Sequence, residues 1–144
     1  MKILILNGPN LNLTGQREVK IYGTTSFDDY IQILRKKYSD ITIDYFQTNV
    51  EGEIINSLHE ADEKYDGIIL NCGGYSHTSV AIADAIAAIK TTVIEVHISN
   101  VFGRESYRQN MITASKATGL IIGLGLGSYE TALLYLKDVT NSGI

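Results

Sequence analysis

Apolar runs of strand length alternate along the chain with segments of helical periodicity. The first and third runs, KILILN and GIILN, are almost continuously apolar, as in strands that are buried on both faces. The second, ITIDYFQ, alternates in part, which favours an edge strand with one face less covered. The pattern predicts strands over residues 2–7, 41–47, 67–71, 92–97 and 119–125.

Helical patterns occupy the intervals between these runs. They predict helices over 26–38, 49–65, 79–89 and 128–139, and a shorter helix with irregular ends within 104–118. Ser26 is the expected N-cap of the first helix, with Asp29 at the capping-box position, and Asn49 is the expected cap of the second. The stripe that the first helix should bury contains Phe27, Tyr30, Ile31, Ile33, Leu34 and Tyr38.

This order of elements predicts an α/β fold in one domain over residues 1–144. A strand followed by a helix, repeated five times, implies a parallel sheet with helices on both faces and right-handed crossovers. Five strands in a chain of 144 residues favour the flavodoxin-like three-layer α/β/α arrangement with strand order 2-1-3-4-5. In such sheets ligands bind beyond the carboxyl ends of the strands, near the point where strand order reverses.

Polar residues gather at three of these strand ends. The stretch NGPNLNLTGQREVKIYG (7–23) follows the first strand and is too irregular for a helix or strand. NCGGYSHTS (71–79) follows the third strand, and the fourth ends in EVHISN. Glu95 and His97 are two residues apart and therefore point to the same side of their strand. Because the fold brings these ends together, the sequence predicts one polar cleft there.

Composition and charge narrow the class of protein. A hydrophobic content of 44% with 19% charged residues is typical of a soluble globular protein. A net charge of −4 provides no basic face for nucleic acid or an anionic membrane. A single cysteine excludes an internal disulfide and fits a reducing compartment. The N-terminus MKILILNG indicates a strand rather than a signal peptide, and no run reaches transmembrane length. A cytoplasmic location is expected.

Other kinds of site fit the residues less well. Two histidines and Glu95 could bind zinc, but E-V-H on one strand favours a carboxylate that orients an imidazole. Cys72 as a nucleophile lacks basic neighbours, and His59 lies among acidic residues, where it is expected to be solvated. GLGLGS (123–128) lacks the spacing of a dinucleotide loop and indicates a tight strand-to-helix turn.

Two other functions use the same fold. A flavin- or nucleotide-binding electron-transfer module needs a Ser/Thr/Gly-rich phosphate loop after the first strand, where this chain has asparagines and a proline. A phosphoacceptor signalling domain needs acidic residues at the ends of the first and third strands, where Asn7 and Asn71 stand.

The motifs LNGPNLNLTGQRE…YG, NCGGYSHTSVAIADA, EVHISN and RESYRQN together resemble those of the type II 3-dehydroquinate dehydratases. The resemblance covers essentially the whole chain. It implies a flavodoxin-like hydro-lyase that converts 3-dehydroquinate to 3-dehydroshikimate in the shikimate pathway of aromatic amino acid biosynthesis. The elimination of water would be anti and would pass through an enolate. It also implies no metal or organic cofactor and a homododecamer built as a tetramer of trimers.

The resemblance also assigns roles. Tyr22 would be the general base, with Arg17 beside it, and His97 the general acid, oriented by Glu95. Asn10 would help to position the reacting groups. Substrate contacts would fall on Asn71, His77, Asp84, Ile98, Ser99 and Arg108.

The chain departs from the usual family pattern at several positions. Cys72 stands where proline is common, Gly74 where alanine is common and Ala83 where arginine is frequent, and VFGRES replaces a more usual VHAREE. None of these changes removes a predicted catalytic side chain. The altered loop after the third strand is expected to affect substrate affinity rather than chemistry.

Elementary chemistry supports the paired tyrosine and arginine. A free tyrosine has a pKa of about 10, so ionising it at pH 7 costs about 4 kcal/mol. A nearby arginine lowers an acid's pKa by roughly 1–3 units, and a loop that closes over substrate strengthens the attraction. We therefore interpret residues 7–23 as a catalytic lid. No lysine stands at a predicted strand end, which disfavours a Schiff-base dehydratase.

Overall fold

The sheet of the computed structural model has five parallel strands in the order β2-β1-β3-β4-β5. The model describes residues 1–16 and 19–143, without the side chains of Ile21 and Tyr22. The strands are β1 (Lys2–Asn7), β2 (Thr42–Gln47), β3 (Gly67–Asn71), β4 (Val93–His97) and β5 (Gly119–Ile122). The predicted order and the edge position of β2 are confirmed. The last strand ends earlier than predicted because Gly123 turns the chain with a φ of 86°.

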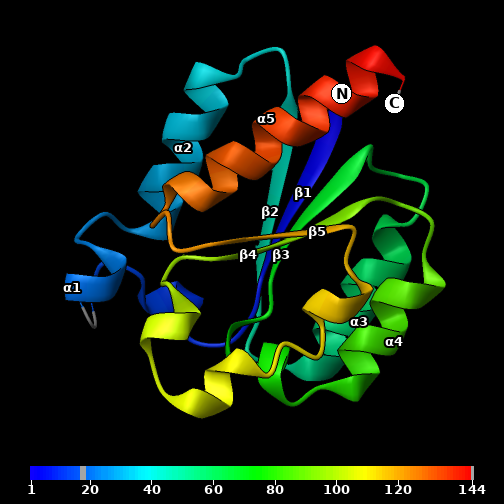
Figure 1. The fold of residues 1–144 in the computed structure, drawn as a ribbon. Coiled ribbons are helices and arrows are strands. Elements are labelled where there is room, and N and C mark those ends of the chain that lie inside the picture. Colours follow the sequence, from blue (N-terminus) through cyan, green and yellow to red (C-terminus); the bar gives the residue numbers. More distant parts are fainter. Residues whose placement is uncertain (17–18, 144) are drawn as a thin grey trace.

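Two pairs of helices cover the sheet (Figure 1). One face carries α2 (Phe27–Lys37) and α5 (Gly127–Ser142), and the other carries α3 (Glu51–Ala61) and α4 (Val80–Ala88). Side chains of β1 alternate between the two cores: Ile3 and Ile5 pack with α2 and α5, whereas Leu4 and Leu6 pack with α3 and α4. The three-layer α/β/α architecture predicted from the sequence is confirmed.

The helix boundaries test the predicted caps. Ser26 caps α2, because its hydroxyl accepts a hydrogen bond from the Asp29 N–H at 3.1 Å. The prediction that Asn49 caps the next helix is wrong, because the N-cap of α3 is Val50, one residue after Asn49. The Asn49 side chain instead accepts from the backbone N–H of Asn10. Ile33 was expected in the buried stripe of α2 but is 55% exposed.

The α3 helix also ends at Ala61, four residues before the predicted end. Asp62 leaves the helix, and its carboxylate accepts hydrogen bonds from the N–H groups of Lys90 and Thr91 in the connection between α4 and β4. A carboxylate that hydrogen-bonds to the backbone of a distant segment in this way holds its own residue outside the helix.

The connection from β4 to β5 contains no α-helix, so the prediction of a short helix within 104–118 is wrong. It forms three 3-10 turns, η3 (Val101–Gly103), η4 (Ser106–Gln109) and η5 (Ala114–Lys116). The N–H groups of Ile112 and Thr113 donate to the Ser76 carbonyl, which fastens this connection to the segment after β3. The connection therefore runs along the carboxyl edge of the sheet and brings polar side chains to it.

Residues 7–23 are more regular than their composition suggests. A 3-10 turn, η1 (Leu11–Leu13), follows β1, and a one-turn helix, α1, covers Val19–Tyr22. Leu11 is buried and fixes the first part of the segment to the core. Among the described residues, none of the helices is both long enough and apolar enough to span a bilayer.

Candidate active site

A cleft opens at the carboxyl edge of the sheet, as predicted. Its walls come from the segments that follow β1, β3 and β4. The lining residues are Pro9, Asn10, Leu11, Thr14, Asn71, Gly73, Gly74, His77, His97, Ile98, Ser99, Val101, Arg104 and Arg108. Of the predicted substrate and catalytic residues, the fold thus brings Asn10, Asn71, His77, His97, Ile98, Ser99 and Arg108 to one place.

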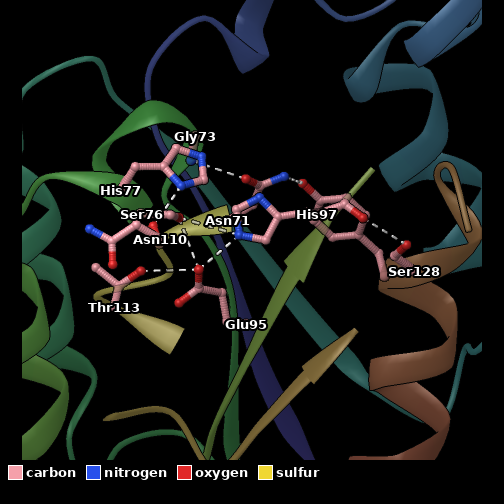
Figure 2. Close-up of polar contacts among 10 residues, drawn as sticks. Asn71, Gly73, Ser76, His77, Glu95, His97, Asn110, Thr113 and Ser128 are labelled. Atoms are coloured by element: carbon pink, nitrogen blue, oxygen red, sulfur yellow. Dashed lines mark hydrogen bonds and ion pairs between the residues drawn. The ribbon is translucent and has the colours of Figure 1, made fainter. Parts of the chain in front are cut away.

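Glu95 and His97 form a buried pair at the tip of β4 (Figure 2). The Glu95 carboxylate accepts a hydrogen bond from His97 Nε2 at 2.8 Å, and both side chains are almost fully buried. Because the carboxylate can only accept, Nε2 carries a proton. His97 lines the cleft, so Nδ1 is the nitrogen through which it can act on a ligand. It can donate from Nδ1 only as an imidazolium, with a proton on each ring nitrogen.

Two hydroxyl groups hold the Glu95 carboxylate. Ser76 Oγ donates to Oε1 at 2.9 Å and Thr113 Oγ1 donates to the same oxygen at 3.0 Å. Oε2 is buried and has no hydrogen-bond partner among the described residues. These donors stabilise a carboxylate that is shielded from water. Sequence reasoning missed the roles of Ser76 and Thr113 as donors to Glu95. Thr113 lies in the connection that was predicted as a helix.

His77 lies beside His97, with 6.3 Å between the ring centroids. Its Nδ1 lies 2.9 Å from the Asn110 carbonyl oxygen and therefore carries the proton (Figure 2). Burial lowers the pKa of His77 from its ordinary value of 6.5, with a smaller contribution from the nearby charges of His97 and Arg108. In the neutral ring Nε2 is an acceptor, which suits a ligand hydroxyl group.

Asn71 ends β3 and contacts its surroundings through both ends of its amide. Its Nδ2 donates to the hydroxyl oxygen of Tyr129 at 2.8 Å, and its Oδ1 accepts from the Gly73 N–H at 3.0 Å. Tyr129 comes from α5 and is fully buried. Sequence reasoning missed Tyr129, because it has the pattern of an ordinary core position of the last helix.

The start of the 7–23 segment is tied to neighbouring strands. Asn10 has a φ of 70°, in the left-handed region, and its N–H donates to Asn49 Oδ1 at 3.0 Å. The Gly8 N–H donates to the Asn71 carbonyl at 2.7 Å, and Gln47 Nε2 donates to the Gly8 carbonyl at 3.2 Å. A side chain at Gly8 would collide with the backbone of Cys72, so only glycine fits this approach. The base of the segment is therefore held in place.

Two arginines reach the cleft from the β4–β5 connection. Arg108 Nε donates to Glu105 Oε2 at 2.6 Å, and Arg104 Nη1 donates to Ser99 Oγ at 3.3 Å. Arg108 was predicted as a substrate contact. Arg104 was missed, although it stands in the RESYRQN motif four residues before Arg108. Together they give the cleft a local positive charge in an acidic protein.

Among the described residues, the predicted contact Asp84 is not brought to the cleft, and two further predictions cannot be placed. Asp84 is exposed on α4 and does not line the cleft of its own chain. Arg17 lies outside the described residues, and so does the side chain of Tyr22, whose backbone ends α1. The roles predicted for these three residues stay predictions.

Competing sites can be compared with the same geometry. No group of three His, Cys, Asp or Glu side chains within the described ranges is arranged to hold a metal ion. Cys72 is fully buried, and this burial raises the pKa of its thiol well above the ordinary value, which opposes a nucleophilic role. His59 is exposed, as predicted. The GLGLGS stretch forms the tight turn between β5 and α5, with positive φ at Gly123 and Gly125.

Comparison with known proteins agrees with this geometry. Residues 1–137 match the family model described as Dehydroquinase class II. The chain is 50% identical to a 3-dehydroquinate dehydratase of Fusobacterium nucleatum, with 98% of this chain and 99% of the relative covered. It is 47% identical to a relative of the same name from Thermoanaerobacter pseudethanolicus, covering 98% and 97% of the two chains. The crystal structure of a type II dehydroquinase from Butyrivibrio crossotus superposes with a TM-score of 0.91 at 42% identity and covers 95% of this chain and 97% of that one. The chain therefore belongs to the type II dehydroquinase family.

Proposed function

We propose that the cleft dehydrates 3-dehydroquinate to 3-dehydroshikimate, a hydro-lyase reaction of the shikimate pathway. The observation that carries the proposal is the buried Glu95–His97 pair, which leaves Nδ1 of the His97 ring for a ligand in a cleft with two arginines. The relatives named 3-dehydroquinate dehydratase, 50% and 47% identical over nearly the whole chain, support it.

The first step would remove a proton from the carbon next to the ketone. Tyr22, ionised with the help of Arg17, takes this proton, and the C–H electron pair forms an enolate. Both residues belong to the segment whose base, at Asn10, lines the cleft. The Tyr22→Phe variant should lower turnover by at least about a hundredfold while remaining folded, because the base is lost. Turnover close to that of the native enzyme would remove Tyr22 from the mechanism.

The enolate oxygen needs a donor as its negative charge develops. Asn71 lines the cleft, and only one of its two Nδ2 protons is used by Tyr129. Its second proton can face the enolate directly or through a water, with Asn10 beside it. Because the amide is fixed at both ends, it needs no reorganisation during the reaction.

The second step expels the hydroxyl group on the neighbouring carbon. The C–O bond breaks, the enolate collapses to a conjugated C=C bond, and the departing hydroxyl takes a proton from His97 Nδ1 to leave as water. Nε2 keeps its own proton throughout and donates it in the hydrogen bond to Glu95. The base and the acid act from opposite faces of the ring, so the elimination is anti.

The remaining cleft residues would bind the substrate. Arg108, with Ile98 and Ser99, holds the carboxylate, and neutral His77 accepts from a ring hydroxyl. Every step uses side chains of the protein, so the proposed reaction requires no cofactor. Asp84 does not line this cleft, so its predicted contact with substrate would come from a second copy of the chain, which fits the proposed homododecamer of four trimers. A single domain over residues 1–144 and a cytoplasmic location remain part of the proposal.

An ultraviolet assay with 3-dehydroquinate tests the function, because the product is a conjugated enone. We expect absorbance to rise with enzyme and to do so equally with a chelator present. No product would reject the proposed function. Loss of activity on chelation would show that the site depends on a metal ion.

A further inference from the structure

The Tyr129 hydroxyl bridges the ends of two central strands. It lies 2.8 Å from Asn7 Oδ1 and 2.8 Å from Asn71 Nδ2, and the Tyr129 side chain is fully buried. Asn7 and Asn71 are partners in the β1–β3 register. The hydroxyl therefore lies behind the cleft at the point where strand order reverses, which is where this class of sheet binds ligands.

Each hydrogen bond in this cluster has one permitted direction. The Gly73 N–H can only donate, so the atom of Asn71 that faces it at 3.0 Å must be the acceptor Oδ1 (Figure 2). Asn71 Nδ2 must then face Tyr129 and donate to its oxygen. The single hydroxyl proton is left for Asn7 Oδ1. The backbone of Gly73 thus sets the direction of the whole chain of bonds.

The arrangement gives hydrogen-bond partners to both ends of the Asn71 amide, but not to both ends of the Asn7 amide. Asn7 Nδ2 is buried and has no hydrogen-bond partner among the described residues, which is destabilising. Asn71 is held at both ends of its amide, and its second Nδ2 proton remains at the wall of the cleft. A rotated Asn71 amide would place a donor against the Gly73 N–H and a carbonyl oxygen against the hydroxyl, and would turn a different edge toward the ligand.

We propose that Tyr129 is a positioning residue for the dehydration. The Gly73 N–H sets which end of the Asn71 amide is the donor, and the Tyr129 hydroxyl holds that donor end in place, so that its second N–H stays turned toward the oxygen on which negative charge develops. Tyr129 itself does not touch the substrate. This inference rests on the proposed function, in which Asn71 stabilises the enolate.

The Tyr129→Phe variant keeps the ring and removes the hydroxyl. We expect kcat to fall about tenfold or more with KM changed by less than about twofold, because the lost interaction acts on the transition state. Tyr30→Phe is the matched control. Tyr30 lies in the same aromatic cluster, 6.3 Å from the Tyr129 ring, and its hydroxyl donates to the Leu126 carbonyl at 2.6 Å, away from Asn71. It should retain native kcat, although it also loses a hydroxyl in the core.

A double-mutant cycle separates positioning from general destabilisation. If Tyr129 acts through Asn71, adding Tyr129→Phe to Asn71→Ala should change kcat by less than about twofold. A full tenfold further loss in that background, or equal losses in Tyr129→Phe and Tyr30→Phe, would overturn the proposal.

Should Tyr129→Phe not fold, Asn7→Ala provides a second test. It removes the acceptor of the hydroxyl proton, which then turns toward the Asn71 donor and displaces the amide. The same loss in kcat supports the proposal, and native kcat overturns it. A native enzyme that forms no enone from 3-dehydroquinate would instead reject the proposed function, so the two failures can be told apart.

Discussion

At the scale of single residues, the site is organised by groups that can hydrogen-bond in only one direction. The Glu95 carboxylate accepts from His97, Ser76 and Thr113, and this fixes the proton of His97 on Nε2. The Asn110 carbonyl does the same for His77 at Nδ1. Carbonyl, carboxylate and backbone N–H groups thus determine which ring nitrogen or amide atom of these cleft side chains is left for a ligand.

Thr113→Val tests the support of Glu95. The substitution keeps the shape of the side chain but removes one donor from a fully buried carboxylate, so the free energy of unfolding should fall by about 1–3 kcal/mol. Urea unfolding measures this loss. Thr131→Val removes a hydroxyl that bonds to the Gly127 carbonyl at an exposed position and should cost no more than about 0.5 kcal/mol. Equal losses in the two variants would contradict the role of Thr113.

The lowered pKa of His77 predicts a pH effect on stability. Because burial holds this pKa below 6.5 in the folded protein, the unfolded chain takes up a proton more readily as the pH falls through 6.5. The contribution of neutral His77 to stability is therefore present above pH 6.5 and is lost on acidification. His77→Gln should show a smaller decrease in the urea midpoint between about pH 7.5 and about pH 5.5 than the native protein does. An identical decrease would mean that His77 titrates alike in both states.

At the scale of secondary-structure elements, the strands and the main helices could be predicted from hydrophobic periodicity, whereas the connections between them could not. The strand ends that carry Asn71 and His97 were placed correctly, because buried parallel strands have a distinctive apolar pattern. The β4–β5 connection was predicted as a helix, but contacts from Ile112 and Thr113 to the distant Ser76 carbonyl hold it in 3-10 turns. Local pattern carries no information about such contacts, so Arg104 and Thr113 were missed.

The β2–α3 loop supports the segment after β1 through Asn49, whose side chain accepts a hydrogen bond from the Asn10 N–H. Asn49→Ala removes the acceptor for the N–H of Asn10, which must hold a left-handed conformation, so turnover should fall by about tenfold and stability by about 1 kcal/mol. Steady-state kinetics and thermal unfolding measure the two effects. Asn56→Ala, at an exposed position of α3, is the control and should match the native enzyme. Native turnover in Asn49→Ala would show that the base of the segment needs no such anchor.

At the scale of the whole molecule, the doubly wound sheet brings distant segments to one edge. Asn10, His77, His97 and Arg108 are far apart in the chain and line one cleft because the parallel strands β1, β3 and β4 end on the same side. The sequence could predict this convergence from topology alone. It could not predict the hydroxyl of Tyr129, because a buried aromatic in the last helix has the same pattern whether or not it orients an asparagine across the sheet.

The central claim is that His97 acts only in the second step, as the acid that releases water. The His97→Asn variant should still exchange the proton next to the ketone with solvent, because Tyr22 forms the enolate. Its release of water should fall by at least about a hundredfold. Incubation of this variant with 3-dehydroquinate in deuterated water measures both steps at once. Deuterium in the recovered substrate with little enone is the expected result, and enone formed at the native rate would contradict the account.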